Sequence, residues 1–161
     1  MWANYYSNGM LVLLVRVCAA CVILSSVACS SGRFTSDINT TVVRFPNGTN
    51  ITAEVKRHDY DLLRGMMYRD SLAPDRGMLF AHPSEDIFHY WMYQTRIPLD
   101  IIWMNRDHRV VEMSLNTPPC VSESAKDCAN YGGTQKSQFV LEVNAGIAAK
   151  NGLAVGDFLD F

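Results

Sequence analysis

Two acidic side chains occur within apolar stretches of the sequence, where a charge needs either a partner or a chemical task, and an arginine follows a short stretch of methionine and tyrosine residues. Asp100 lies inside the apolar run of residues 97–104, and Glu142 interrupts another apolar run at residues 139–143. A buried carboxyl group is costly unless it is paired or hydrogen-bonded, so either residue could act as a general base or anchor a substrate. Arg69 offers a planar fork of donors that suits a carboxylate or phosphate group.

Each of these residues also has a structural interpretation. Asp100 is expected to accept hydrogen bonds from Arg69, another arginine or backbone N–H groups, and we favour this role over a catalytic one. Glu142 could join Asp100 as an acid and base pair in an envelope hydrolase or carbohydrate-active enzyme. Strand alternation places Glu142 on the face opposite Leu141, which is more often exposed to solvent. The paired-carboxylate enzyme is therefore kept as an alternative.

Aromatic residues cluster between Arg69 and Asp100 in the sequence. Trp91, with Tyr90 and Tyr93 beside it, could line a sugar-binding or aromatic pocket, although core packing accounts for part of this aromatic content. We predict that Trp91, Arg69 and Asp100 surround a small ligand-binding pocket.

A set of methionine and histidine residues suits Cu(I), because thioether and imidazole groups are soft ligands. The set comprises Met66, Met67, Met78, Met92, Met104 and Met113, with His82 and His89. Methionine is also an ordinary filler of hydrophobic cores, and most of these residues fall where periodicity predicts burial. Copper binding is therefore a second alternative, and we predict no resident metal.

The charge balance and the motifs narrow the function classes. The chain of 161 residues has 14 Lys plus Arg against 16 Asp plus Glu, a net charge of −2, which gives no electrostatic footprint for nucleic acid. It contains no Gly-x-Ser-x-Gly elbow, phosphate-binding Gly-Lys-Ser/Thr loop, dinucleotide fingerprint or His-Glu-x-x-His sequence. The sequence therefore predicts no nucleic-acid partner and no cofactor, and it favours a binding protein over an enzyme.

Residues 1–28 differ in composition from the rest of the chain. Arg16 is their one charged residue, and the apolar stretch that follows it, residues 17–24, is too short to span a bilayer. A positive residue, a short apolar core and small residues before a cleavage site are typical of a secretory signal peptide. We also hypothesise that translation begins at Met10.

The residue after this leader is Cys29. It follows the tripeptide Ser-Val-Ala that ends at Ala28. This arrangement resembles a bacterial lipobox, in which cleavage exposes a cysteine that carries diacylglycerol. Ser26 stands where the lipobox usually has leucine. Residues 29–40 are then a lipidated tether, and residues 41–161 are a single domain at the periplasmic face of a bacterial membrane. Simple secretion and an uncleaved anchor are the alternatives.

The remaining cysteines are consistent with an exported protein. Cys18 and Cys21 leave with the leader, so Cys120 and Cys128 remain as one pair. An oxidising compartment favours a disulfide between them that closes a small loop. Two free thiols are the alternative, and zinc is disfavoured because no histidine lies nearby in the sequence.

Strand patterns outnumber helical patterns in the exported part. Hairpins are predicted at residues 41–56 and 99–115, shorter strands at 78–81, 139–143 and the C-terminus, helices at 59–68 and 144–150, and a long irregular stretch at 117–136. No strand–helix–strand unit repeats. We therefore predict a mainly β (α+β) fold, a compact barrel-like domain, closed or half-closed, with one or two short helices.

Four clusters of residues resemble a known family in their order and spacing. They begin at Gly65 (Gly-Met-Met-Tyr-Arg), Gly77 (Gly-Met-Leu-Phe), Tyr90 (Tyr-Trp-Met, followed by Ile-Pro-Leu-Asp-Ile) and Val140 (Val-Leu-Glu, followed by Ala-Gly and Gly-Asp). The chain resembles the bacterial and archaeal domain of unknown function number 192, many of whose members are exported or membrane-anchored. The resemblance supports a β-rich fold and implies no particular reaction.

The sequence departs from the family pattern at His89, Tyr93 and Gln94. If these residues shape a pocket, the ligand of this member differs from that of its relatives. We expect a tethered, non-enzymatic binding or accessory module, held at the membrane by lipid on Cys29, with an unidentified small molecule or protein as its ligand.

Overall fold

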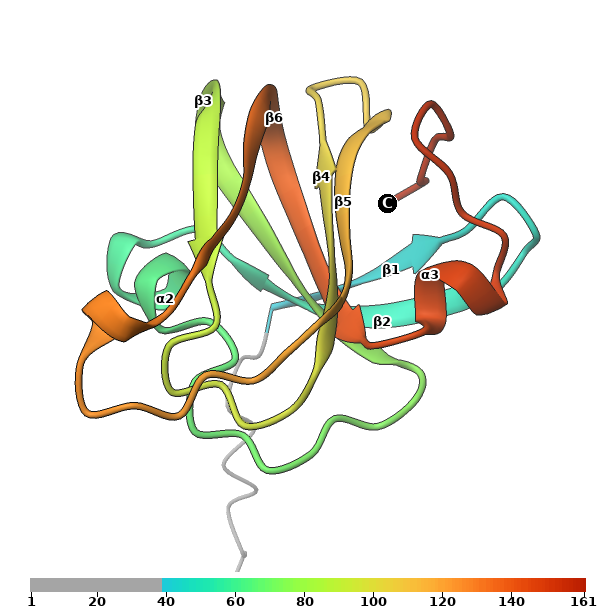
Figure 1. Ribbon diagram of the computed structural model, residues 1–161. Helices are drawn as coiled ribbons and strands as arrows, with labels where there is room; N and C mark the ends of the chain where they lie inside the picture. Colours follow the sequence, from blue (N-terminus) through green and yellow to red (C-terminus); the bar gives the residue numbers. More distant parts are fainter. Residues whose placement is uncertain (1–38) are drawn as a thin grey trace, which may run out of the picture. The chain divides into compact units, whose positions relative to one another are not determined.

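The computed structural model describes residues 39–161, so the predicted signal peptide, Cys29 and nearly all of the predicted tether lie outside the described residues. Strands dominate this part of the chain (Figure 1). They are β1 (Thr40–Arg44), β2 (Asn50–Lys56), β3 (Arg76–Trp91), β4 (Leu99–Met104), β5 (Val110–Thr117) and β6 (Asn130–Asn144). The helical elements are α2 (Asp59–Arg64), the 3-10 turn η1 (Ala125–Asp127) and α3 (Ile147–Lys150).

The strands of the described residues form one six-stranded sheet in the order β1-β2-β3-β6-β4-β5. Neighbouring strands run antiparallel, except that β2 and β3 are parallel and are connected through α2. Because β1 and β5 are separate edges, the sheet does not close on itself. The prediction of a mainly β fold with short helices is confirmed, whereas the word barrel applies only loosely.

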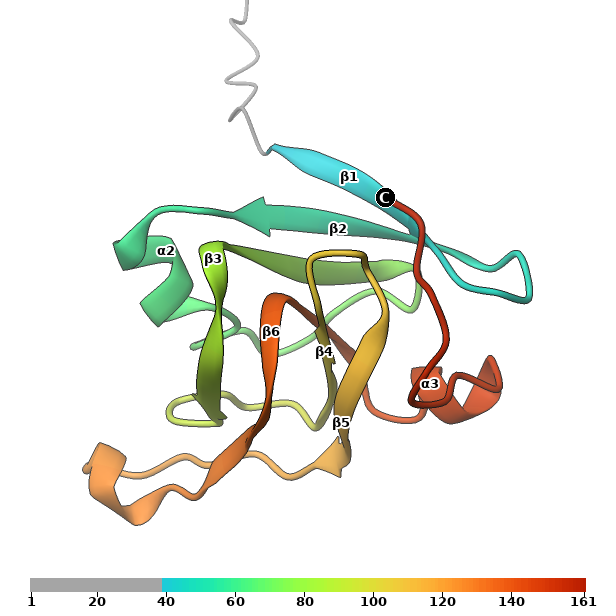
Figure 2. The ribbon, with the colours of Figure 1, turned by 90° about the horizontal axis from the view of Figure 1, so that it is seen from above.

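The long strands β3 and β6 bend and join two parts of the sheet. Their pairing shifts register between Ala81 and Asp86 and again between Ile87 and His89. Such irregularities bend a strand and increase its twist. Figure 2 shows the result: β1, β2 and the first part of β3 lie across the direction of β4 and β5, while the rest of β3 turns to run alongside β6.

The central strands of the sheet are buried on both faces. All six residues of β4 are buried, although successive side chains of a strand point to opposite faces. One core cluster contains Ile102 and Leu141, and Ala148 of α3 belongs to it. The other contains Trp103 and Val140. A charged side chain on either face of the central strands is therefore removed from water.

Two strands are longer than the sequence predicted. The predicted short strand at residues 78–81 is the first part of β3, and β6 already begins at Asn130, within the stretch that was predicted to be irregular. The outer halves of β3 and β6 pair with each other, for example at Tyr90 and Tyr131. They are rich in polar residues and glycine, which disfavour strands when each segment is considered alone.

The helices are short. Helix α2 ends at Arg64, before Gly65, which has a positive φ of 45°, and α3 begins at Ile147 after Gly146. No helix among residues 39–161 is both long and apolar enough to cross a membrane. The predicted C-terminal strand consists of isolated bridges, such as Arg44 with Asp160.

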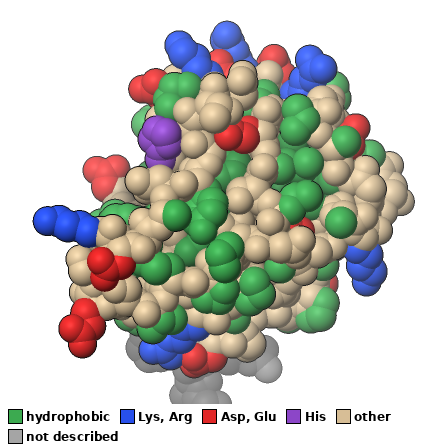
Figure 3. Space-filling model, viewed as in Figure 1, with side chains coloured by type: hydrophobic (Ala, Val, Ile, Leu, Met, Phe, Trp, Pro, Cys, Tyr) green, Lys and Arg blue, Asp and Glu red, His purple; other side chains and the backbone are tan. Residues whose placement is uncertain are grey.

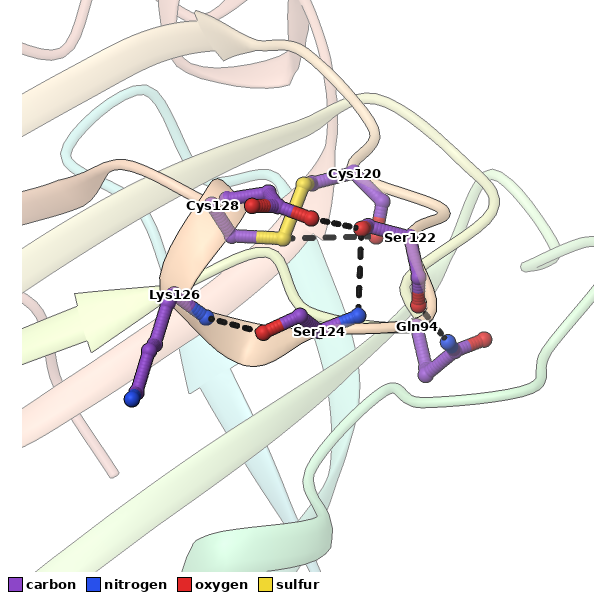
Figure 4. Close-up of a disulfide and its surroundings, with 7 residues drawn as sticks. Gln94, Cys120, Ser122, Ser124, Lys126 and Cys128 are labelled. Carbon is purple, nitrogen blue, oxygen red and sulfur yellow. Dashed lines mark hydrogen bonds between the residues drawn. A yellow bond between two sulfur atoms is a disulfide. The ribbon is translucent and has the colours of Figure 1, made fainter.

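Cys120 and Cys128 form the predicted disulfide, which is confirmed by an S–S distance of 2.04 Å (Figure 4). Its loop is held by hydrogen bonds: the N–H of Ser124 donates to Ser122 Oγ at 3.2 Å, and the Gln94 side chain donates to the Ser122 carbonyl. The backbone of Cys120 also bridges Tyr93 and Thr95. The disulfide therefore anchors the chain segment that follows β3.

Replacing both cysteines of the disulfide with serine should lower the free energy of unfolding by about 2–3 kcal/mol, because the cross-link restricts the conformations that the unfolded chain can adopt. The sequence separation of 8 residues makes this a small loop and places the effect at the lower end for disulfides. Urea unfolding with and without reductant measures it. The double serine variant is the control, since reductant should not change its midpoint. Equal midpoints for the oxidised and reduced protein would contradict the prediction.

Candidate functional site

A cavity of about 290 Å³ lies between α2 with its following segment and the sheet. Figures 1 and 2 both show α2 beside β3, at the side where this cavity is formed. The lining comes from Leu62, Leu63, Arg64, Gly65, Met66 and Met67, from Phe80, His82, Phe88, His89, Tyr90 and Trp91, and from Tyr93, Thr95, Asn130 and Glu142. The wall is thus largely aromatic and apolar, with Glu142 as its one carboxyl group and with polar side chains from Arg64, two histidines, Thr95 and Asn130.

Glu142 is the acidic group of this cavity. The residue is only 4% exposed, so the sequence-based expectation that its face points to solvent is wrong; the face opposite Leu141 is covered by the second core cluster. Its neighbours across the sheet are Met78 and Ile101. Among residues 39–161, Glu142 Oε2 and Ser137 Oγ are the buried side-chain oxygens without a hydrogen-bond partner.

Burial raises the pKa of Glu142 to about 8, although the positive charge of Arg69 acts in the opposite direction. A carboxyl group with this pKa is mostly protonated at pH 7. Strongly shifted groups in cavities are typical of binding and catalytic sites. The combination of burial, an unpartnered oxygen and an open cavity makes Glu142 the central residue of the candidate site.

Gly65 lets the backbone approach this carboxyl group. A Cβ atom added there would lie 3.1 Å from Phe80 Cζ and 3.9 Å from Glu142 Oε2, and the positive φ of Gly65 is unfavourable for other residues. The end of α2 is therefore placed where it forms a wall of the cavity without a side chain that would fill it.

Aromatic rings form much of the remaining wall. The rings of Trp91 and Tyr93 lie 5.7 Å apart, and Tyr90 packs edge-to-face on Phe80 at 5.2 Å. Tyr90 Oη is also 3.0 Å from His82 Nε2. Burial lowers the pKa of His82, while burial and the charge of Glu142 raise the pKa of Tyr90 well above its usual value. Both side chains are therefore neutral at pH 7.

Asp100 does not line this cavity. Its side chain is fully buried and accepts hydrogen bonds from the backbone N–H groups of Asn116 at 2.8 Å and Ala148 at 2.9 Å. In the sheet Asp100 is opposite Val143, whereas Glu142 is opposite Ile101. Adjacent residues point to opposite faces, so the two carboxyl groups do not share a cleft, as the paired-carboxylate enzyme would require.

Arg69 also lies away from the wall of this cavity. Its guanidinium donates two hydrogen bonds to the Glu54 carboxylate, at 2.7 and 2.8 Å, and Lys56 Nζ lies 3.1 Å from the same group. These partners lower the pKa of Glu54 to about 2, with the Arg69 hydrogen bonds as the largest cause. Arg69 lines a separate, smaller cavity of about 220 Å³. Of the three predicted ligand-binding residues, the structure places Trp91 alone at the larger cavity.

The methionine residues considered for copper are divided between the two cores. Met104 lies in one cluster, while Met66, Met78 and Met92 lie in the other. Two of the set, Met66 and Met67, reach the cavity along with His82 and His89. His89 Nδ1 already contacts the Gly132 carbonyl at 3.2 Å. Within the described chain, no group of three or more His, Cys, Asp or Glu side chains could hold a metal ion.

Charged side chains form no continuous patch on the face shown in Figure 3. Apolar side chains lie across its middle, and Lys, Arg, Asp and Glu side chains are interspersed around its edge.

The fold is that of a small β domain with an open, strongly bent sheet. A cavity lies between this sheet and the short helix α2, and the buried carboxyl group of Glu142 lines it. The chain belongs to the DUF192 family of uncharacterised proteins, whose model matches residues 42–161. A search of curated proteins finds no match.

Two solved structures are similar to this chain. One is a protein from Sinorhizobium meliloti 1021, proposed to be a transcription regulator, with 29% identity, a TM-score of 0.64, and coverage of 74% of this chain and 89% of that one. The other is a protein of unknown function from Novosphingobium aromaticivorans DSM 12444, with 30% identity, a TM-score of 0.64, and coverage of 76% and 84%. Both support the fold and neither supplies a reaction.

Proposed function

We propose that this protein is an exported, lipid-anchored module of the bacterial cell envelope that binds a small ligand in the cavity around Glu142. The observation that carries the ligand-binding part is the buried carboxyl group, which has an oxygen without a protein partner and faces a cavity with aromatic walls. An unpaired buried polar group costs stability, so a binding role gives a reason for its presence. The volume of about 290 Å³ is at the lower end for small-ligand pockets.

The envelope location rests on the sequence of residues 1–29, with its signal-peptide pattern and Cys29, and the Cys120–Cys128 disulfide is compatible with it. Mass spectrometry of the full chain expressed in a bacterium tests this part. We expect an N-terminal peptide that begins at Cys29 and carries diacylglycerol, and a Cys29→Ser variant that lacks the lipid. An unmodified N-terminus at Cys29 would contradict lipid anchoring.

Ligand binding is tested with three aromatic probes of similar shape and different charge: benzamidine, benzamide and benzoate. Titration followed by NMR should show that at least one of them shifts the amide signals of Gly65, Trp91 and Glu142. Trp91→Ala should weaken this binding about tenfold or more, because a stacking surface is lost. Tyr60→Ala is the matched control, since Tyr60 is 71% exposed and does not line the cavity. If none of the probes shifts these signals at millimolar concentration, the cavity is not a ligand site.

A further inference from the structure

The carboxyl group of Glu142 faces the cavity without a cationic partner inside it. The guanidinium whose charge acts on Glu142 is that of Arg69, and it donates two hydrogen bonds to Glu54. Arg64 lines the cavity but is exposed, and an exposed charge is screened by water and salt. No ion pair of Glu142 is present among residues 39–161.

Two other titratable groups that line the cavity do not supply a charge. On β3, His82 and Tyr90 are neutral at pH 7 because burial lowers the pKa of the first and raises that of the second. His89, also on β3, and Tyr93, which follows this strand, line the cavity as well, and His89 Nδ1 contacts the Gly132 carbonyl. From β4, Asp100 points to the opposite face of the sheet. Because no basic side chain among the described residues forms an ion pair with Glu142, a positive charge paired with this carboxyl group would come from a ligand.

The aromatic walls favour the same kind of ligand. The faces of tryptophan and tyrosine rings carry partial negative charge and attract cations. Trp91 and Tyr93 lie side by side at the cavity, with ring centres 5.7 Å apart. An anionic ligand would meet the carboxyl group of Glu142 in a cavity lined by these two rings, whereas a cation would find attractive partners in both.

Building on the proposed function, we propose that the cavity recognises ligands with a protonated amine, amidine or guanidine group, whose positive charge pairs with Glu142 and lies against the aromatic walls. On binding, the carboxyl group releases its proton to water and becomes the carboxylate of an ion pair. Because the free carboxyl group is close to ionisation at neutral pH, a cation in a cavity of low dielectric can shift it to the charged form.

Isothermal titration of the full chain with benzamidine and benzamide tests the proposal, because the two probes share a shape and differ in charge. We expect benzamidine to bind at least about tenfold more tightly at pH 8. Its affinity should rise about tenfold from pH 6 to pH 7, the slope for release of one proton, and less steeply toward pH 8, where the free carboxyl group is half ionised. Repeating the titration at pH 7 in buffers of different ionisation enthalpy should show release of about one proton with benzamidine and none with benzamide.

Glu142→Gln should remove the preference for benzamidine and its pH dependence, while benzamide affinity changes by less than about twofold. Glu123→Gln removes a charge from an exposed position and should change neither probe. Binding of benzamide or benzoate as tight as that of benzamidine, or benzamidine binding without a pH slope, would overturn the cation proposal and leave the ligand-binding proposal standing. Absence of binding by every probe would overturn both.

Discussion

Replacing Glu142 with glutamine should stabilise the protein by about 3 kcal/mol at pH 7 and by about 5 kcal/mol at pH 9. The reason is the raised pKa of about 8 against an ordinary value of 4.5. Below pH 4.5 the carboxyl group is protonated in both the folded and unfolded states, so ionisation costs nothing. As the pH rises from 4.5 to 8, the unfolded state loses its proton while the folded state keeps it, and folding stability falls. Above pH 8 the loss is complete.

Urea unfolding at pH 5, 7 and 9 measures this effect in the wild-type protein and in Glu142→Gln. The difference between the two should grow with pH up to about 8, because glutamine has nearly the same shape and does not ionise. Glu123→Gln serves as the matched control and should follow the wild-type curve. A constant difference between Glu142→Gln and the wild type across this pH range would show that Glu142 ionises normally in the folded protein.

Replacing Asp100 with alanine should destabilise the protein by about 3–5 kcal/mol, because two buried backbone N–H groups lose a charged acceptor. These groups belong to Asn116, near the end of β5, and Ala148, in α3. Asp100→Asn should cost less, since its carbonyl oxygen can still accept one of the two hydrogen bonds.

Hydrogen exchange gives this prediction a local measurement beside chemical unfolding. In Asp100→Ala, the amide protons of Asn116 and Ala148 should exchange faster relative to those of the central strands. The cavity around Glu142 lies on the other face of the sheet, so probe binding should change by less than about twofold in Asp100→Asn. Unchanged stability of Asp100→Ala would indicate that other acceptors replace the carboxylate.

The sequence predicts the local elements of this fold better than it predicts which side chains meet. Apolar runs on either side of turn residues correctly indicate the β1–β2 and β4–β5 hairpins. Glu142 is misjudged because alternation tells which residues share a face but not whether that face is covered. The cover is provided by Met66 and Met92, from separate parts of the chain. The continuous apolar run of β4 was the available signal, since a strand buried along its whole length has cover on both sides.

Local sequence patterns also do not predict which polar residues meet at the candidate site. The sequence predicts one pocket for Asp100, Arg69 and Trp91, from a carboxyl group in an apolar run, a fixed cation and an aromatic cluster. The structure gives Asp100 two backbone partners and Arg69 a carboxylate partner, Glu54, on β2. The contacts that separate these residues from the cavity join segments far apart in the chain, and single-residue patterns do not contain that information.

Backbone β-bridges join Cys120 to Tyr93 and Thr95, so the disulfide of Cys120 is connected to the wall of the cavity. Both of the bridged residues line the cavity, and the Gln94 N–H between them donates to the Cys120 carbonyl at 2.9 Å. The disulfide restrains the chain segment around Cys120, which supports this wall. Reduction of the disulfide would remove that restraint, and we expect the wall formed by Tyr93 and Thr95 to be held less firmly under reducing conditions.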